Sequence, residues 1–148
     1  MKAVIQRVKK AQVSVGEEIV GSIQVGFLIL LGITHDDTEE DVTWLVQKIE
    51  KLRVFSDDQG AMNLDLNAVN GAVLVVSQFT LFANYKKGNR PSFINAAHPD
   101  NAKPLYQLFI EKMQTSIPTQ QGIFGADMQI TLQNDGPVTI LMDTKNKE

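Results

Sequence analysis

The feature that most constrains the fold is a pair of short, almost wholly apolar runs. Phe27–Ile33 has the sequence FLILLGI, and Ala72–Val76 has the sequence AVLVV. Runs of this length and composition are typical of strands that are buried on both faces, as in the middle of a covered sheet. Other segments of the chain must therefore pack apolar side chains against both faces of this sheet. The periodicity of the rest of the sequence indicates which segments these are.

Alternating apolar and polar residues predict further strands around these two. A period-two pattern extends over Lys2–Val15, with a bulge expected near Lys9–Ala11. A turn at Gly16 leads into the next expected strand. The other expected strands are Ile19–Gln24, a short one around Met62–Leu66, Thr119–Phe124, and two within Met128–Met142 that are joined by a hairpin around Asp135-Gly136.

Two segments have helical periodicity. The first is expected to begin after Thr38, which can cap a helix whose first turn carries three acidic residues, and to end near Arg53. Its apolar residues recur at helical spacing and form one face. The second is expected over about Asp100–Ser116, with Pro104 in the first turn, where proline costs little because no intrahelical partner is lost.

The order of these elements indicates an α/β fold. With 148 residues and no linker or repeat, the chain is expected to form one domain over residues 1–148. We predict a mixed β-sheet closed into a barrel-like core, with two main helices packed outside it.

Composition excludes several kinds of site. The chain has no cysteine and two histidines, neither in a metal-binding spacing, so no metal or thiolate chemistry is expected. The net charge of −3 disfavours non-specific nucleic-acid binding, and no DNA partner is expected. The N-terminus lacks the apolar region of a signal peptide, and the longest uncharged stretch, Ile19–Thr34, is short for a membrane span. We therefore expect a cytoplasmic protein without membrane contact.

Four residues directly follow the second apolar run: Ser77, Gln78, Phe79 and Thr80. The end of a buried strand often lines a site, because the rigid sheet directs its last side chains into a crevice. The hydroxyls of Ser77 and Thr80 can act as nucleophiles or as hydrogen-bond donors to a substrate. They can equally satisfy backbone groups where the strand ends.

His98 and Asp100 allow a catalytic triad in which His98 is the base for Ser77 or Thr80. No spacing rule supports this triad, and His98-Pro99-Asp100 also has the pattern of a segment that leads into a helix. The triad is therefore the weaker of the two interpretations.

Two positively charged features stand apart from these residues. The loop Lys86–Arg90 has the sequence KKGNR, which suits a phosphate group or the end of an RNA strand, and also suits a solvated turn. Arg7 lies among apolar residues of a predicted strand. If it is buried it must find a partner, whereas on an edge strand it needs none.

Gly136-Pro137 is the most specific irregularity. A hairpin is expected at Asp135-Gly136, yet Pro137 has no N–H with which to continue the ladder. The proline can simply end the pairing. Alternatively, the pair projects from the sheet and presents a rigid apolar ring as a steric gate.

Four segments together resemble the D-aminoacyl-tRNA deacylase family in its bacterial and eukaryotic form. They are MKAVIQRV at the N-terminus, VSQFTL at Val76–Leu81, KKGNRPSF at Lys86–Phe93, and NDGPVT at Asn134–Thr139. The resemblance extends over essentially the whole chain, and the second and fourth segments are jointly specific.

The resemblance implies an enzyme that hydrolyses the ester between a D-amino acid and the terminal adenosine of tRNA, and that also clears glycine from alanine tRNA. It implies a homodimer whose site lies at the subunit interface, lined by Ser77, Gln78, Phe79 and Thr80, without metal or organic cofactor. By the same resemblance, Gly136-Pro137 matches a Gly-cisPro pair that enters the partner's site, and Arg7 matches an arginine that holds it.

Two questions follow from this resemblance. Catalysis can use Thr80 as nucleophile or can rely on the 2′-hydroxyl of the tRNA, and the absence of a convincing base favours the second route. The rival functions are a non-catalytic RNA-binding module that uses the Lys86–Arg90 loop, and a related deacylase that acts on L-alanyl-tRNA. Phe79 within the SQFTL segment favours the D-specific enzyme over the latter.

Overall fold

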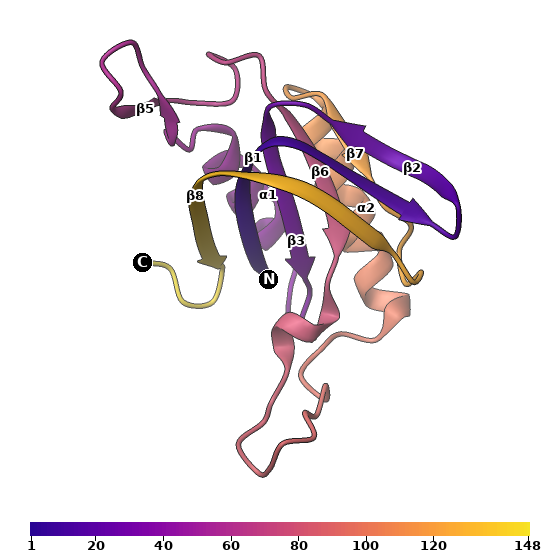
Figure 1. Cartoon of the computed structure of the whole chain (residues 1–148). Coiled ribbons are helices and arrows are strands. Elements are labelled where there is room, and N and C mark those ends of the chain that lie inside the picture. The colour runs from indigo at the N-terminus through magenta and orange to yellow at the C-terminus, as the bar shows by residue number, and fades with distance from the viewer.

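The computed structural model describes residues 1–148 and contains one mixed sheet with two helices on one face (Figure 1). The sheet has the order β2-β1-β3-β6-β7, and β8 also pairs with β1. The β3–β6 and β6–β7 pairs are parallel, and the three pairs of β1 are antiparallel. The strands of this sheet are β1 (Lys2–Val15), β2 (Glu18–Ile23), β3 (Gly26–Gly32), β6 (Ala72–Ser77), β7 (Thr119–Gln121) and β8 (Gln129–Asp143).

Three helical segments and one small ribbon complete the fold. Helix α1 (Glu39–Glu50) and helix α2 (Pro99–Gln114) are the two main helices, and η1 (Phe79–Phe82) is one short 3₁₀ segment. The strands β4 (Phe55–Ser56) and β5 (Met62–Leu64) pair only with each other. The predicted α/β fold with two main helices is confirmed.

The two apolar runs are the central parallel strands β3 and β6, and both are buried on two faces as predicted. Phe27, Ile29 and Leu31 of β3 belong to the larger core, which lies between the sheet and the helices. Leu28 belongs to a smaller core on the opposite face, with Leu74 of β6. In Figure 1, α1 and α2 lie behind the sheet, while β8 crosses in front of it.

The barrel is nearly closed, and its last gap is filled by packing rather than by a ladder. Strand β2 contacts β6 and β7 but forms no hydrogen-bonded pair with either. At Gly21 of β2, a Cβ atom would come within 2.9 Å of the Gln121 carbonyl oxygen and 3.0 Å of Leu74 Cδ1. Only glycine permits this approach, so the residue type at position 21 helps to close the barrel.

The ends of the helices follow the predicted signals closely. Thr38 is the N-cap of α1, and its backbone N–H donates to the Asp41 carboxylate at 2.8 Å. The helix ends at Glu50, with Lys51 as C-cap, rather than near Arg53. Pro104 lies inside α2 in its second turn, not in the first turn as expected from the sequence.

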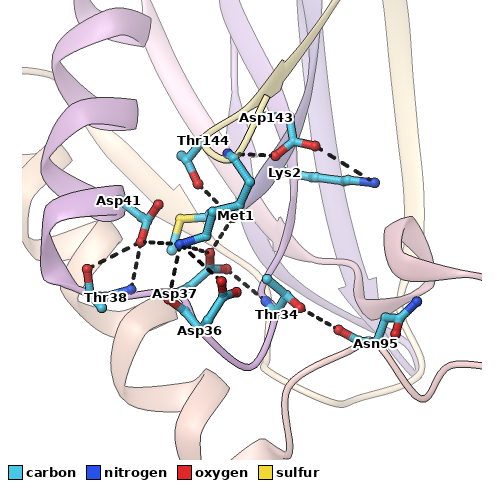
Figure 2. A network of polar contacts seen from close by, with 11 residues as sticks. Met1, Lys2, Thr34, Asp36, Asp37, Thr38, Asp41, Asn95, Asp143 and Thr144 are labelled. Carbon is cyan, nitrogen blue, oxygen red and sulfur yellow. Dashed lines mark hydrogen bonds and ion pairs between the residues drawn. The ribbon is translucent and has the colours of Figure 1, made fainter. Parts of the chain in front are cut away.

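A buried polar network joins both ends of the chain to the turn before α1 (Figure 2). The Met1 ammonium group pairs with the Asp37 carboxylate at 2.5 Å and donates to Thr144 Oγ1 at 2.8 Å, and both members of the ion pair are inaccessible to solvent. The N–H of Thr34 also donates to Asp37, at 2.8 Å. Lys145 Nζ contacts Asp41 at 3.1 Å at the edge of this network.

The expected hairpin at Asp135-Gly136 is wrong. The segment Gln129–Asp143 is one strand that pairs with β1 on both sides of this point. Gln6 is opposite Thr139 and Val8 is opposite Asn134, so four residues of β8 lie opposite Arg7 alone. The long partner strand β1 overrides the local turn signal, and the extra residues form a bulge.

Two smaller expectations have different outcomes. The strand expected over Thr119–Phe124 is shorter and ends at Gln121. The bulge expected near Lys9–Ala11 is confirmed, because the β1–β8 register shifts between Val8 and Lys10.

Candidate active site

The segment Ser77–Thr80 leaves the sheet at the carboxyl end of β6. Ser77 is the last residue of that strand and lies opposite Leu31 of β3. The N–H of Gln78 donates to the Leu31 carbonyl at 2.8 Å, which extends the pairing by one residue. The chain then turns into η1, which begins at Phe79. The central strands thus fix the position of this segment, as the sequence predicts.

The four side chains differ in exposure. Ser77 and Gln78 are half-buried, whereas Phe79 and Thr80 are exposed. The Gln78 side-chain amide donates a hydrogen bond to the Thr80 hydroxyl. Phe79 is 57% exposed, although it is a large apolar side chain at a predicted site. An exposed aromatic ring in this position is available to a ligand or to another protein surface.

A pocket of about 430 Å³ opens beside this segment. Its walls are mainly apolar, and Phe79 and Phe93 form one of them by packing edge to face at 5.0 Å between ring centroids. Ser77 and Gln78 provide the polar groups of the lining, together with His98. A smaller hollow of about 200 Å³ lies on the other side of Ser77–Phe79. Thr80 lines neither of them.

His98 has a structural role that accounts for its position. It is the N-cap of α2, and its Nδ1 accepts a hydrogen bond from the Asp100 N–H at 3.3 Å. The side chain of His98 is 70% exposed and makes no hydrogen bond to Ser77 or Thr80. The weaker interpretation, a Ser/Thr-His-Asp triad, is therefore not supported by the geometry, and the helix-leading interpretation is.

Arg7 is buried, with 8% of its surface exposed, and it has the partners that burial requires. Its Nη1 donates to the Val54 carbonyl at 2.5 Å, and its Nε donates to the Asp135 carbonyl at 3.0 Å. The Asp135 carboxylate lies 3.4 Å from the same Nε. Arg7 therefore connects the β8 bulge to the segment that precedes β4.

Gly136 and Pro137 are the exposed residues of this bulge. Their peptide bond is cis, the isomer that the resemblance implies. Gly136 has a φ of +122°, and a Cβ atom there would lie 2.8 Å from Arg7 Nη2. The backbone conformation favours glycine at this position, and the nearby Arg7 leaves little room for a side chain.

A single chain does not bring the two groups of predicted residues together. Neither hollow beside Ser77–Phe79 is lined by Gly136, Pro137 or Arg7. The bulge lies on β8, whose only strand partner is β1, whereas the pocket lies at the end of β6. Within one chain, the two groups of residues therefore lie at different places on the sheet.

Several pocket residues carry no signal in the local sequence pattern. Phe124 and Gly125 line the pocket from the segment after β7, and Ala96 and Ala97 line it from the segment before α2. Among the pocket residues that the sequence analysis did not single out, only Phe93 could have been found, since it ends the KKGNRPSF motif.

No group of three or more His, Cys, Asp or Glu side chains is arranged as a metal site. No helix has the length and apolar character that a membrane crossing requires.

Two solved structures share the architecture of this chain. One, described as "c-Myc DNA Unwinding Element Binding Protein", superposes with a TM-score of 0.91 over 97% of this chain and 98% of that chain, at 41% identity. Another, described as "Structural Analysis of a probable eukaryotic D-amino acid tRNA deacylase", has a TM-score of 0.82 over 95% and 97% of the two chains. At 16% identity, the second likeness concerns the fold alone.

Sequence comparison then identifies the family. A sequence model of the family described as D-Tyr-tRNA(Tyr) deacylase matches residues 4–143. The D-aminoacyl-tRNA deacylase of Cytophaga hutchinsonii is 60% identical over 100% of both chains. That of Fusobacterium nucleatum is 57% identical over 99% of this chain and 97% of the relative. The chain belongs to the D-Tyr-tRNA(Tyr) deacylase family, and the family resemblance seen in the sequence is confirmed.

Proposed function

We propose that the protein hydrolyses the ester that joins a D-amino acid to the terminal adenosine of tRNA, and also the corresponding glycyl ester on alanine tRNA. The observation that carries this proposal is the position of Ser77–Phe79 beside an apolar pocket at the end of β6, in a chain that belongs to this family over residues 4–143. The substrate is aminoacyl-tRNA, and a location in the cytoplasm, where tRNA is charged, follows from that substrate.

The chemistry needs little from the protein because an aminoacyl ester is already activated. Water forms a bond to the carbonyl carbon, the bond to the ribose oxygen breaks, and that oxygen takes up a proton. The N–H groups in the first turn of a helical segment have no intrahelical partner, so those of Phe79 and Thr80 in η1 can donate to the developing oxyanion. Positioning the ester against these donors then supplies much of the catalysis.

The tRNA itself is proposed to assist the reaction. Thr80 is exposed, lines neither hollow, and shares a hydrogen bond with Gln78 rather than with a base. His98 makes no hydrogen bond to a hydroxyl of the segment. This lack of an activated side chain supports a route through the neighbouring 2′-hydroxyl of the terminal adenosine, with Ser77, Gln78 and Phe79 forming the lining.

Selection against L-amino acids is proposed to come from Gly136 and Pro137 of a second copy in a homodimer. The two residues are exposed on the β8 bulge, and Arg7 donates a hydrogen bond to the Asp135 carbonyl of that bulge. A D-residue or glycine can direct hydrogen toward such a wall, whereas an L-residue must direct its side chain there and clash. Since the wall need not contact the D side chain, broad tolerance of side chains is expected.

The test separates the enzyme from a non-catalytic RNA-binding module. Purified protein is mixed with D-tyrosyl-tRNA and the released tyrosine is measured over time. Release well above the spontaneous rate supports the proposal, whereas binding without release favours the module. L-alanyl-tRNA in a parallel reaction tests the related deacylase, and preferred hydrolysis of that substrate would replace the D-specific proposal.

A further inference from the structure

The positive charge of the central part of the chain is confined to one loop. Between Asp65 and Asp100 the sequence contains no Asp or Glu, and its only cations are Lys86, Lys87 and Arg90. The whole chain has a net charge of −3. This loop is therefore a local positive region on an otherwise slightly acidic protein, and such a region attracts anions over a short range.

The three cations are free to bind a partner. Each is exposed, and none takes part in an ion pair within the chain. The adjacent Tyr85 is 75% exposed, which is unusual for a large aromatic side chain. Cations interleaved with an exposed aromatic ring are the combination with which proteins bind single-stranded nucleic acid, because an unpaired base offers a face for stacking.

The base of the loop is well anchored. Asn84 and Ser92 exchange two backbone hydrogen bonds of 2.8 Å across it. The chain that follows is tied to the end of β3, since the Thr34 hydroxyl donates to the Asn95 carbonyl at 2.6 Å. Figure 1 shows the segment between η1 and α2 extending well beyond the end of the sheet. The loop is thus presented away from the body of the protein on a fixed base.

The base of the loop also forms part of the pocket. Phe93, which follows Ser92 directly, packs against Phe79, and both rings line the pocket beside Ser77. A strand whose last nucleotide enters this pocket therefore ends beside the base of the loop. The 3′ end of tRNA is single-stranded, so it carries both exposed phosphates and unpaired bases at this point.

We propose that the loop Asn84–Ser92 binds the single-stranded 3′ end of the tRNA upstream of the terminal adenosine. Lys86, Lys87 and Arg90 contact its phosphates, and Tyr85 stacks on an unpaired base. The inference rests on the proposed function and answers how an acidic protein holds a polyanionic substrate.

The experiment compares binding of two non-hydrolysable ligands. One is tRNA that carries glycine through an amide in place of the ester, and the other is the corresponding glycyl-amide of adenosine, which has no phosphate. Lys86→Gln/Lys87→Gln/Arg90→Gln should weaken binding of the tRNA ligand about 100-fold at 0.1 M salt. It should also reduce the slope of log Kd against log salt by about 2, because each contact to a single strand contributes about 0.7. Binding of the adenosine ligand should not change.

Two further variants make the result specific. Tyr85→Ala should weaken the tRNA ligand about 10-fold and leave the salt slope unchanged, because stacking releases no counterions. Lys9→Gln/Lys10→Gln/Lys51→Gln removes the same charge from exposed positions on β1 and at the end of α1, and should leave the slope close to that of the wild type.

The results that would overturn this inference differ from the result that would contradict the proposed function. If the loop variant binds the tRNA ligand as the wild type does, or loses affinity for both ligands equally, the inference is overturned. An equal loss of slope in the charge-matched control would also overturn it. Failure of the wild type to hydrolyse D-tyrosyl-tRNA, measured separately, would instead contradict the proposed function and leave the binding result to stand by itself.

Discussion

At the scale of single residues, Arg7 is the side chain whose surroundings best explain its presence. A buried guanidinium needs several acceptors, and Arg7 finds them in the Val54 carbonyl and in both oxygen-bearing groups of Asp135. These partners lie 47 and 128 positions away in the sequence. The sequence shows that a buried arginine would need partners, but it cannot show which residues a distant segment will provide.

Thr80 tests the proposed chemistry at this scale. We expect Thr80→Ala to lower the single-turnover rate of deacylation by less than about tenfold, because the hydroxyl has no base to activate it and positioning supplies most of the catalysis. The measurement is single-turnover hydrolysis of D-tyrosyl-tRNA at saturating enzyme. A loss near ten-thousandfold with unchanged substrate binding would instead make Thr80 the nucleophile.

At the scale of elements, the sequence predicts the central strands and the two helices because their signals are local. The apolar runs give β3 and β6, and the capped, periodic segments give α1 and α2. It predicts the position of Ser77–Thr80 for the same reason, since the segment follows β6 directly. It does not predict η1, which is too short to carry a periodic pattern.

The wrong prediction of a hairpin within β8 shows where local sequence signals fail. Asp135-Gly136 followed by Pro137 has the pattern of a turn, yet β1 is long enough to pair on both sides of it. Pairing along a 14-residue strand outweighs one unfavourable position, so the irregular residues are extruded as a bulge. The residues that matter for the proposed selectivity are the ones that do not fit the ladder.

The N-terminus of α1 gives a pH prediction. Burial opposes ionisation of Asp41, but hydrogen bonds from Thr144, Thr38 and Lys145 outweigh it and hold the pKa of Asp41 well below its ordinary value of 3.8. A carboxyl with a lowered folded-state pKa stabilises the fold above that ordinary value, and this contribution declines as pH falls below it. The urea concentration at the midpoint of unfolding should therefore decrease as the pH is lowered from 5 to about 3.

The matched variant for this prediction is Asp41→Asn, which keeps the shape and removes the titration. Its urea midpoint should be lower at pH 7 and should vary less with acid pH. Asp57, whose pKa is also lowered, remains in the variant and leaves some acid dependence. An acid dependence as steep as that of the wild type would show that Asp41 is not responsible.

At the scale of the whole molecule, the network around Asp37 joins segments from both ends of the chain. Asp37→Asn leaves the Met1 ammonium group buried without its counter-charge, so we expect the free energy of unfolding to fall by about 3–5 kcal/mol. Urea unfolding at pH 7 measures this free energy. Asp36→Asn is the control, because Asp36 is 76% exposed and its contact with Lys145 contributes at most about 1 kcal/mol. Equal effects of the two substitutions would contradict this account of the network.

The proposed division of the site between two copies predicts the assembly state. Strand β8 pairs only with β1, and Leu141 on it is 76% exposed. An unpaired edge with exposed apolar residues favours association. Sedimentation at micromolar concentration should give twice the mass of one chain. A single-chain mass together with full activity and full rejection of L-amino acids would exclude a shared site.

The most direct measurement is the ratio of hydrolysis rates for D- and L-tyrosine attached to the same tRNA, in the wild type and in Pro137→Ala. Pro137 is an exposed residue of the bulge, and its ring is the proposed barrier to an L side chain. We expect a strong preference for the D-ester in the wild type, and a marked rise in L-ester hydrolysis in the variant while D-ester hydrolysis persists. Unchanged rejection of the L-ester by a folded Pro137→Ala protein would contradict it.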